Sequence, residues 1–186
     1  MTVDAGIVYW AESTAIRAVT TTGGVVTTVV PGIQSPVGLA ISGPDVFWSE
    51  NTCCPVGRSV MRAPLAGGPP QAVASGLDAP QKLVVRGAAV YWAEGQPLVQ
   101  TPAGAGRIAT ASIGGGSVGT VAGGVSSALL TPIASDGVSL YVGDNFVVKR
   151  IPVAGVGTRA LRNQNPGRSS IELDVAGCAA PRRSKQ

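Results

Sequence analysis

Four short apolar segments with the same internal order recur along the chain, and each ends in an acidic residue. They span residues 8–12, 46–50, 90–94 and, in a weaker form without tryptophan, 140–144. Successive side chains of an extended strand point to opposite faces, so Val8 and Trp10 share one face and Tyr9 takes the other. The segments recur at intervals of roughly forty to fifty residues, a period typical of repeat folds.

The flanking residues repeat in step with these segments. A shorter apolar run precedes each later segment, at residues 39–41, 83–85 and 133–134, and a glycine follows it closely. A third apolar run, a glycine turn and a fourth run come after each segment. The third runs are residues 15–17, 60–62, 108–110 and 148–150. Each repeat is therefore predicted to form four strands joined by turns, the make-up of a propeller blade.

We accordingly expect an all-β fold, a β-propeller of about four blades with four antiparallel strands each. The repeats lie near residues 4–38, 39–82, 83–132 and 133–177. A lone four-stranded sheet cannot bury both faces, so neighbouring blades should cover them, with the tryptophans in the seams. Two arrangements stay open. Residues 171–176 would pair beside residues 8–12 and close a four-bladed ring, or the chain is a fragment of a larger propeller that self-associates through its open faces.

The aromatic segments resemble the repeats of the Tyr-Trp-Thr-Asp and NHL-type propeller families, which include the low-density-lipoprotein-receptor class and bacterial relatives. Residues 9–12 and 91–94 read Tyr-Trp-Ala-Glu, and residues 47–50 read Phe-Trp-Ser-Glu. The resemblance covers residues 4–177 and implies a propeller that usually has six blades. Alanine or serine replaces the family's threonine, and glutamate replaces its aspartate.

Composition and charge limit the classes of partner that the chain can be expected to bind. The 26 glycines and 14 prolines divide the apolar sequence into short pieces, and no run is long enough for a membrane span. Basic and acidic residues balance up to residue 158, so the net charge of +4 comes from residues 159–186. No aromatic residue lies among those charges to stack on a base. We therefore expect no nucleic-acid partner and a basic, disordered tail at residues 178–186.

The chain has no histidine, which removes Ser-His-Asp and Cys-His nucleophile systems. Cys53, Cys54 and Cys178 show no zinc-ligand spacing, and we expect no catalytic residue and no cofactor. A disulfide among these cysteines would suit an oxidising compartment, so an extracytoplasmic or secreted location is expected, although the sequence shows no signal peptide. Residues 114–119 match Gly-x-Gly-x-x-Gly, but a strand follows them instead of a helix, so a hairpin turn explains them.

An acidic residue closes each aromatic segment, and an arginine recurs on the following run of three repeats. These residues are Glu12, Glu50, Glu94 and Asp144, with Arg17, Arg62 and Arg150. Ion pairs between adjacent strands explain both series. The alternative is a ring of the four acidic side chains that holds a metal cation, as a metal-dependent propeller hydrolase or lyase would need.

The connection after each aromatic segment varies most in length between repeats. It is long at residues 51–59 and 95–107. Binding residues lie mostly on loops that a rigid scaffold presents. The candidates in these two loops are Asn51, Thr52, Cys53, Cys54, Arg58, Gln96, Gln100 and Arg107. We predict a non-enzymatic binding or scaffold module that recognises a protein or glycan partner through this rim. A truncated fragment without independent function is a further alternative.

Overall fold

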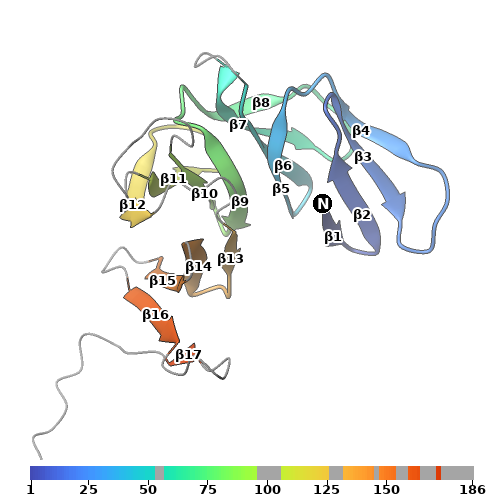
Figure 1. Cartoon of the computed structure of the whole chain (residues 1–186). Helices are drawn as coiled ribbons and strands as arrows, with labels where there is room; N and C mark the ends of the chain where they lie inside the picture. The colour runs from blue at the N-terminus through green and yellow to red at the C-terminus, as the bar shows by residue number, and fades with distance from the viewer. Residues whose placement is uncertain are drawn as a thin grey trace, which may run out of the picture.

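Four antiparallel sheets make up the protein, each built from strands that are consecutive along the chain (Figure 1). The computed structural model describes residues 1–52, 57–95, 106–125, 132–144, 147–153, 159–163 and 171–172. The prediction of an all-β fold with about four antiparallel sheets is confirmed. The fourth sheet departs from the expected four strands because it has five.

The first two sheets follow the sequence repeats closely. Sheet 1 contains β1 (Thr2–Asp4), β2 (Ile7–Ala11), β3 (Ala15–Thr20) and β4 (Thr27–Pro31). Sheet 2 contains β5 (Pro36–Ser42), β6 (Asp45–Glu50), β7 (Ser59–Pro64) and β8 (Gln71–Ser75). The aromatic segments form β2 and β6, the second strand of each sheet.

The last two sheets have the same plan. Sheet 3 contains β9 (Pro80–Arg86), β10 (Ala89–Glu94), β11 (Gly106–Ser112) and β12 (Gly119–Val125). Sheet 4 contains β13 (Ile133–Ser135), β14 (Ser139–Asp144), β15 (Val147–Pro152), β16 (Arg159–Asn163) and β17 (Ile171–Glu172).

Tight turns join the first and second strands, as the glycines at these points predict. Gly43 and Gly87 each have a φ of 56°. This left-handed conformation suits the right-handed twist of a hairpin and costs glycine little. The predicted strand, turn and strand order is therefore confirmed in sheets 2 and 3.

The sheets follow one another along an arc, with their first strands on the inside (Figure 1). A cavity of about 350 Å³ lies there, lined by residues of β1, β5, β9 and β13. The first strands of neighbouring sheets contact one another around it, most extensively β5 and β9. This is the arrangement of propeller blades around a common axis.

Three apolar clusters fill the seams between consecutive sheets. In each seam the tryptophan face of one sheet packs against the opposite face of the sheet before it. Trp48 packs with Ile16 and Val30 of sheet 1, and Trp92 packs with Phe47 and Val60 of sheet 2. Both tryptophans are 0% exposed, which confirms the prediction that they fill the seams. Sheet 4 has Val142 at the equivalent position, where it is buried against sheet 3.

The proposed closure of a four-bladed ring is wrong. Residues 2–4 form β1 and pair with β2, the strand that residues 171–176 were expected to join. Ile171 and Glu172 pair instead with β16, and residues 173–176 lie outside the described part of the chain. Pairing through the short turn at residues 5–6 closes a much smaller loop than pairing with the distant end, so it costs less entropy.

Sheet 1 and sheet 4 occupy the two ends of the arc (Figure 1). Trp10, on the outward face of sheet 1, is accordingly only partly buried. The seam role predicted for the tryptophans therefore holds for two of the three.

The turn between β13 and β14 depends on one carboxylate. Asp136 accepts hydrogen bonds from the backbone N–H groups of Val138 and Ser139, both at 2.7 Å, and from the Tyr141 hydroxyl at 2.8 Å. These donors, the two backbone groups first, lower the pKa of Asp136 to about 2. The glycine at residue 137 predicts this turn from the sequence, but the part that Asp136 plays in it is not predicted.

We expect the fold to lose stability as the pH falls from about 4 towards 2, in part because Asp136 is protonated there. A carboxyl group whose pKa is lower in the folded chain stabilises the fold above the pKa of the unfolded chain, and this contribution disappears as the folded group takes up its proton. Urea unfolding at several pH values should show a weaker acid dependence for Asp136→Asn. Tyr141→Phe removes one of the three donors and should show an intermediate dependence. Identical acid profiles for the three proteins would contradict the assignment.

Candidate functional site

The long connections leave the sheets at one common edge, called here the loop rim. It carries the connections from second to third strands and from fourth strands to the next sheet. Of the β6–β7 connection, the structure describes residues 51–52 and 57–58; of the β10–β11 connection, it describes residue 95. Cys53, Cys54, Gln96 and Gln100 lie outside the described residues. The described part of the candidate site consists of the remaining rim residues.

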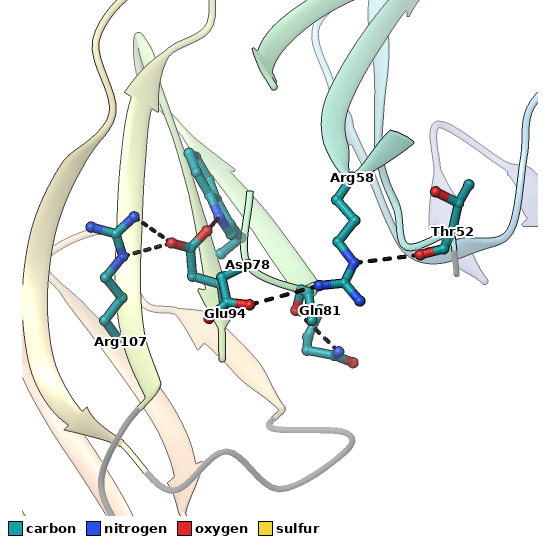
Figure 2. A network of polar contacts seen from close by, with 8 residues as sticks. Thr52, Arg58, Asp78, Gln81, Glu94 and Arg107 are labelled. Atoms are coloured by element: carbon teal, nitrogen blue, oxygen red, sulfur yellow. Dashed lines mark hydrogen bonds and ion pairs between the residues drawn. The ribbon is translucent and has the colours of Figure 1, made fainter. Parts of the chain in front are cut away.

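Arg58 ties the first long connection to the neighbouring sheet (Figure 2). Its Nε donates to the Thr52 carbonyl oxygen at 3.4 Å, and its Nη1 lies 3.7 Å from Asp78 Oδ1. The Arg58 side chain is 16% exposed and that of Asp78 52%. The structure thus brings together Thr52 and Arg58, two of the predicted binding residues. The sequence alone does not predict their contact.

The same short stretch also holds the start of the second long connection. Gly95 N–H donates to the Asp78 carbonyl oxygen at 2.8 Å, and Leu77 N–H donates to the Arg58 carbonyl oxygen at 3.2 Å. Residues 77–78 therefore link the two connections, which leave adjacent sheets. Asn51 donates its N–H to the Ser35 carbonyl oxygen at 3.1 Å, which extends the β5–β6 pairing of sheet 2 into the rim.

Arg107 does not belong to the loop, which corrects its sequence assignment. The strand β11 begins at Gly106, and Arg107 lies directly opposite Glu94 in the β10–β11 register. Its Nε donates to Glu94 Oε1 at 2.6 Å (Figure 2). The Glu94 side chain is only 2% exposed, whereas that of Arg107 is 40% exposed. Arg107 therefore compensates a buried charge.

Each of the three described glutamates of the aromatic segments binds its own tryptophan. The indole Nε1–H donates to the carboxylate two residues later, at 3.1 Å in sheet 1, 2.9 Å in sheet 2 and 2.7 Å in sheet 3. Residues i and i+2 of a strand share a face, so this spacing brings the two groups together. The pairs are Trp10 with Glu12, Trp48 with Glu50, and Trp92 with Glu94, called here the Trp–Glu pairs.

The predicted ion pairs are confirmed only in part. Arg17 Nε lies 3.1 Å from Glu12 Oε2, and the pKa of Glu12 is lowered by the Trp10 hydrogen bond and then by Arg17. Arg62 does not pair with Glu50, because it lies opposite Phe47 and so on the other face of sheet 2. Its partner there is Asp45, at 3.9 Å.

The fourth acidic residue is placed only by its backbone. Asp144 ends β14, and its side chain is outside the description. Arg150 donates to the Ser139 hydroxyl at 2.9 Å. Throughout the described ranges, no three acidic or cysteine side chains gather in a group that could hold a metal ion.

Ser49, next to Trp48 on β6, supplies a cross-sheet contact. Its buried hydroxyl accepts the N–H of Gly38 at 2.8 Å and donates to the carbonyl oxygen of Gln81 at 2.7 Å. A Cβ on Gly38 would lie 2.7 Å from that same carbonyl oxygen, so only glycine allows β5 and β9 to approach this closely. The rims of sheets 2 and 3 are therefore held in fixed positions.

A cavity of about 410 Å³ opens beside this rim, between sheets 1 and 2. Its lining includes residues of the β4–β5 connection, the end of the β6–β7 connection and the strands β6, β7 and β8. The lining residues with functional groups or large side chains are Gln34, Trp48, Glu50, Ser59, Met61 and Ser75.

Comparison with known proteins supports the fold. No protein-family model and no curated protein matches the chain. Among solved structures, the nidogen/laminin complex matches with a TM-score of 0.63 and 19% identity over 86% of this chain and 62% of that one. TolB from Acinetobacter baumannii matches with a TM-score of 0.55 and 15% identity, over 79% and 37% of the two chains.

The computationally designed Ika8 protein matches with a TM-score of 0.54 and 16% identity, over 86% of this chain and 47% of that one. The chain thus spans less than two thirds of the length of these structures. At such identities the likeness shows the fold alone. The chain has a β-propeller fold whose ring is not closed. Within the described residues, no helix has the length and apolar character to cross a membrane.

Proposed function

We propose that the protein is a non-enzymatic binding or scaffold module that recognises a protein or glycan partner through the loop rim. One observation carries the proposal: the two long connections leave adjacent sheets and are tied together through Arg58, Asp78 and Gly95. Loops held on a rigid scaffold present binding groups without a large ordering cost. The described glutamates of the aromatic segments, in contrast, are all bonded to tryptophans.

The proposal extends to the family and the location. A Tyr-Trp-Thr-Asp type of repeat is supported by the tryptophans in the seams and by the cross-sheet contact of Ser49. An extracytoplasmic location is supported by Cys53 and Cys54, which are adjacent in one rim connection and could form disulfides in an oxidising compartment.

Replacing residues 96–105 with a short Gly-Ser linker is expected to abolish partner binding and leave the fold intact. The replacement must stop before Gly106 and Arg107, because these residues belong to β11. Affinity capture with the whole chain, followed by binding measurements on the purified partner, should show at least a tenfold loss of affinity.

A matched control changes the opposite edge. The turn at residues 113–118 joins β11 to β12 there, and replacing it with a linker of equal length should leave binding unchanged. If the 96–105 variant still binds the partner and the 113–118 variant does not, the partner binds at the edge opposite the loop rim. That result would refute the proposal.

A further inference from the structure

Two of the three Trp–Glu pairs are completed by an arginine. In sheet 1, Trp10 binds one carboxylate oxygen of Glu12, and Arg17 binds the other. In sheet 3, Trp92 and Arg107 divide the two oxygens of Glu94 in the same way. A threonine on the fourth strand then accepts a hydrogen bond from the same guanidinium. These threonines are Thr28 for Arg17 and Thr120 for Arg107.

Sheet 2 has the tryptophan and the glutamate but lacks the arginine. The strand registers identify the equivalent positions. Met61 lies opposite Trp48 as Arg17 lies opposite Trp10, and Ser59 lies opposite Glu50 as Arg107 lies opposite Glu94. Ala72 takes the place of the two threonines, since it pairs with Met61. All three side chains that would supply or hold a guanidinium are therefore replaced by smaller or uncharged ones.

Among the described residues, donors contact only one oxygen of the Glu50 carboxylate. Trp48 Nε1–H and the N–H of Gln34 both donate to Oε1, at 2.9 and 3.1 Å. No cation contacts Oε2 in the part of the chain that the structure describes. Residues 53–56 lie outside the described part of the chain; in the sequence they are two cysteines, a proline and a valine, none of which carries a positive charge.

The cavity of about 410 Å³ lies where the arginine is missing. Glu50, Ser59, Met61 and Ala72 all line it. Its lining combines the apolar side chains of Met61 and Ala72 with one charged group, the Glu50 carboxylate. An arginine side chain has the matching character, with an apolar stem and a charged planar head.

We propose that this cavity binds an arginine side chain presented by a protein partner. The guanidinium would contact Glu50 as Arg17 and Arg107 contact their glutamates, and its stem would lie along Met61. Arginine is preferred to lysine because its planar head has several donors in a fixed geometry and keeps its charge on partial burial. The cavity opens at the loop rim, so this inference rests on the proposed function and specifies part of the partner's chemistry.

The three tryptophans of the chain provide a direct assay with N-acetyl-arginine amide as the probe. In an NMR titration each indole N–H gives one signal. We expect the Trp48 signal to shift saturably, because its donor shares the carboxylate with the probe, and the Trp92 signal to stay in place, because Arg107 already occupies Glu94. N-acetyl-citrulline amide, of the same shape but uncharged, should cause no shift of Trp48. Equal shifts with both probes, or no shift with the arginine probe, would refute the site.

Two variants separate the charge from the shape of the cavity. Glu50→Gln keeps the size of the side chain and should weaken probe binding at least tenfold. Met61→Arg places an arginine where sheet 1 has Arg17, so it should fill the cavity and abolish the shift. Met61→Leu is the matched control and should retain binding. Unchanged binding by both Glu50→Gln and Met61→Arg would exclude the cavity.

The probe experiment needs no partner, so it fails separately from the proposed function. If the probe does not bind, the arginine site is wrong, and the 96–105 replacement still decides the rim proposal. If the probe binds and Glu50→Gln abolishes binding, the cavity stands even when partner capture proves independent of residues 96–105.

Discussion

Replacing Arg107 with methionine is expected to lower the free energy of unfolding by about 3 kcal/mol, the lower end of the cost of breaking a buried ion pair. Glu94 keeps its tryptophan donor in this variant but loses the cation that compensates its charge. Its side chain is 2% exposed in the intact pair, and methionine leaves a side chain of similar length over it, so water replaces the guanidinium only in part. Guanidinium chloride unfolding followed by tryptophan fluorescence measures the loss.

The matched control is Arg62→Met. Arg62 lies 3.9 Å from Asp45, and both side chains are partly exposed, so the expected cost is below about 1 kcal/mol. Adding Glu94→Gln to Arg107→Met should recover much of the stability, because it removes the uncompensated charge. Equal losses for the two arginine variants, or no recovery in the double variant, would show that the pair is not a buried charge compensation.

Trp92→Ala is expected to cost about 3 to 5 kcal/mol, the range found when a fully buried aromatic side chain is removed from a core. Trp92 fills the seam between sheets 2 and 3, where it packs with Phe47, Val60 and Leu83. The change also removes the indole donor of Glu94. Chemical denaturation followed by far-ultraviolet circular dichroism is the appropriate measurement, because it does not depend on the deleted fluorophore.

Trp10→Ala provides the comparison within the same repeat position. Trp10 is only partly buried, and its sheet lies at an end of the arc of described sheets, so its removal should cost about half as much or less, in proportion to the apolar area lost. A larger loss for Trp10→Ala than for Trp92→Ala would contradict the description of the seams.

The fold was largely predictable because the same pattern of apolar and polar residues recurs four times along the chain. Each aromatic segment carries its tryptophan on one face, and a sheet with two apolar faces must be covered on both. Periodicity therefore predicts the strands and the buried positions of Trp48 and Trp92, but it also places Trp10 in a seam, where the structure does not have it. The closure of the ring was not predictable in this way, because it depends on which segment of the chain pairs with β2. Residues 2–4 pair with it through a short turn.

The candidate site was less predictable, because side-chain partners depend on the register of each strand pair. The apolar run that starts at Ile108 predicts a loop position for Arg107, yet backbone pairing extends the strand to Gly106. Counting repeats pairs Arg62 with Glu50, but a shift of one position puts Arg62 on the face of Asp45. The Trp–Glu pairs could have been found, because a spacing of two in a strand places both side chains on one face.

The seams have a consequence for how the molecule unfolds. Each of the three clusters joins two sheets that are consecutive in the chain, so stability is a sum of sheet terms and nearest-neighbour couplings, as in linear repeat arrays. Such a chain is cooperative only while every coupling is strong. Weakening one seam would let the two halves melt separately, and a single unfolding free energy would then no longer describe the protein.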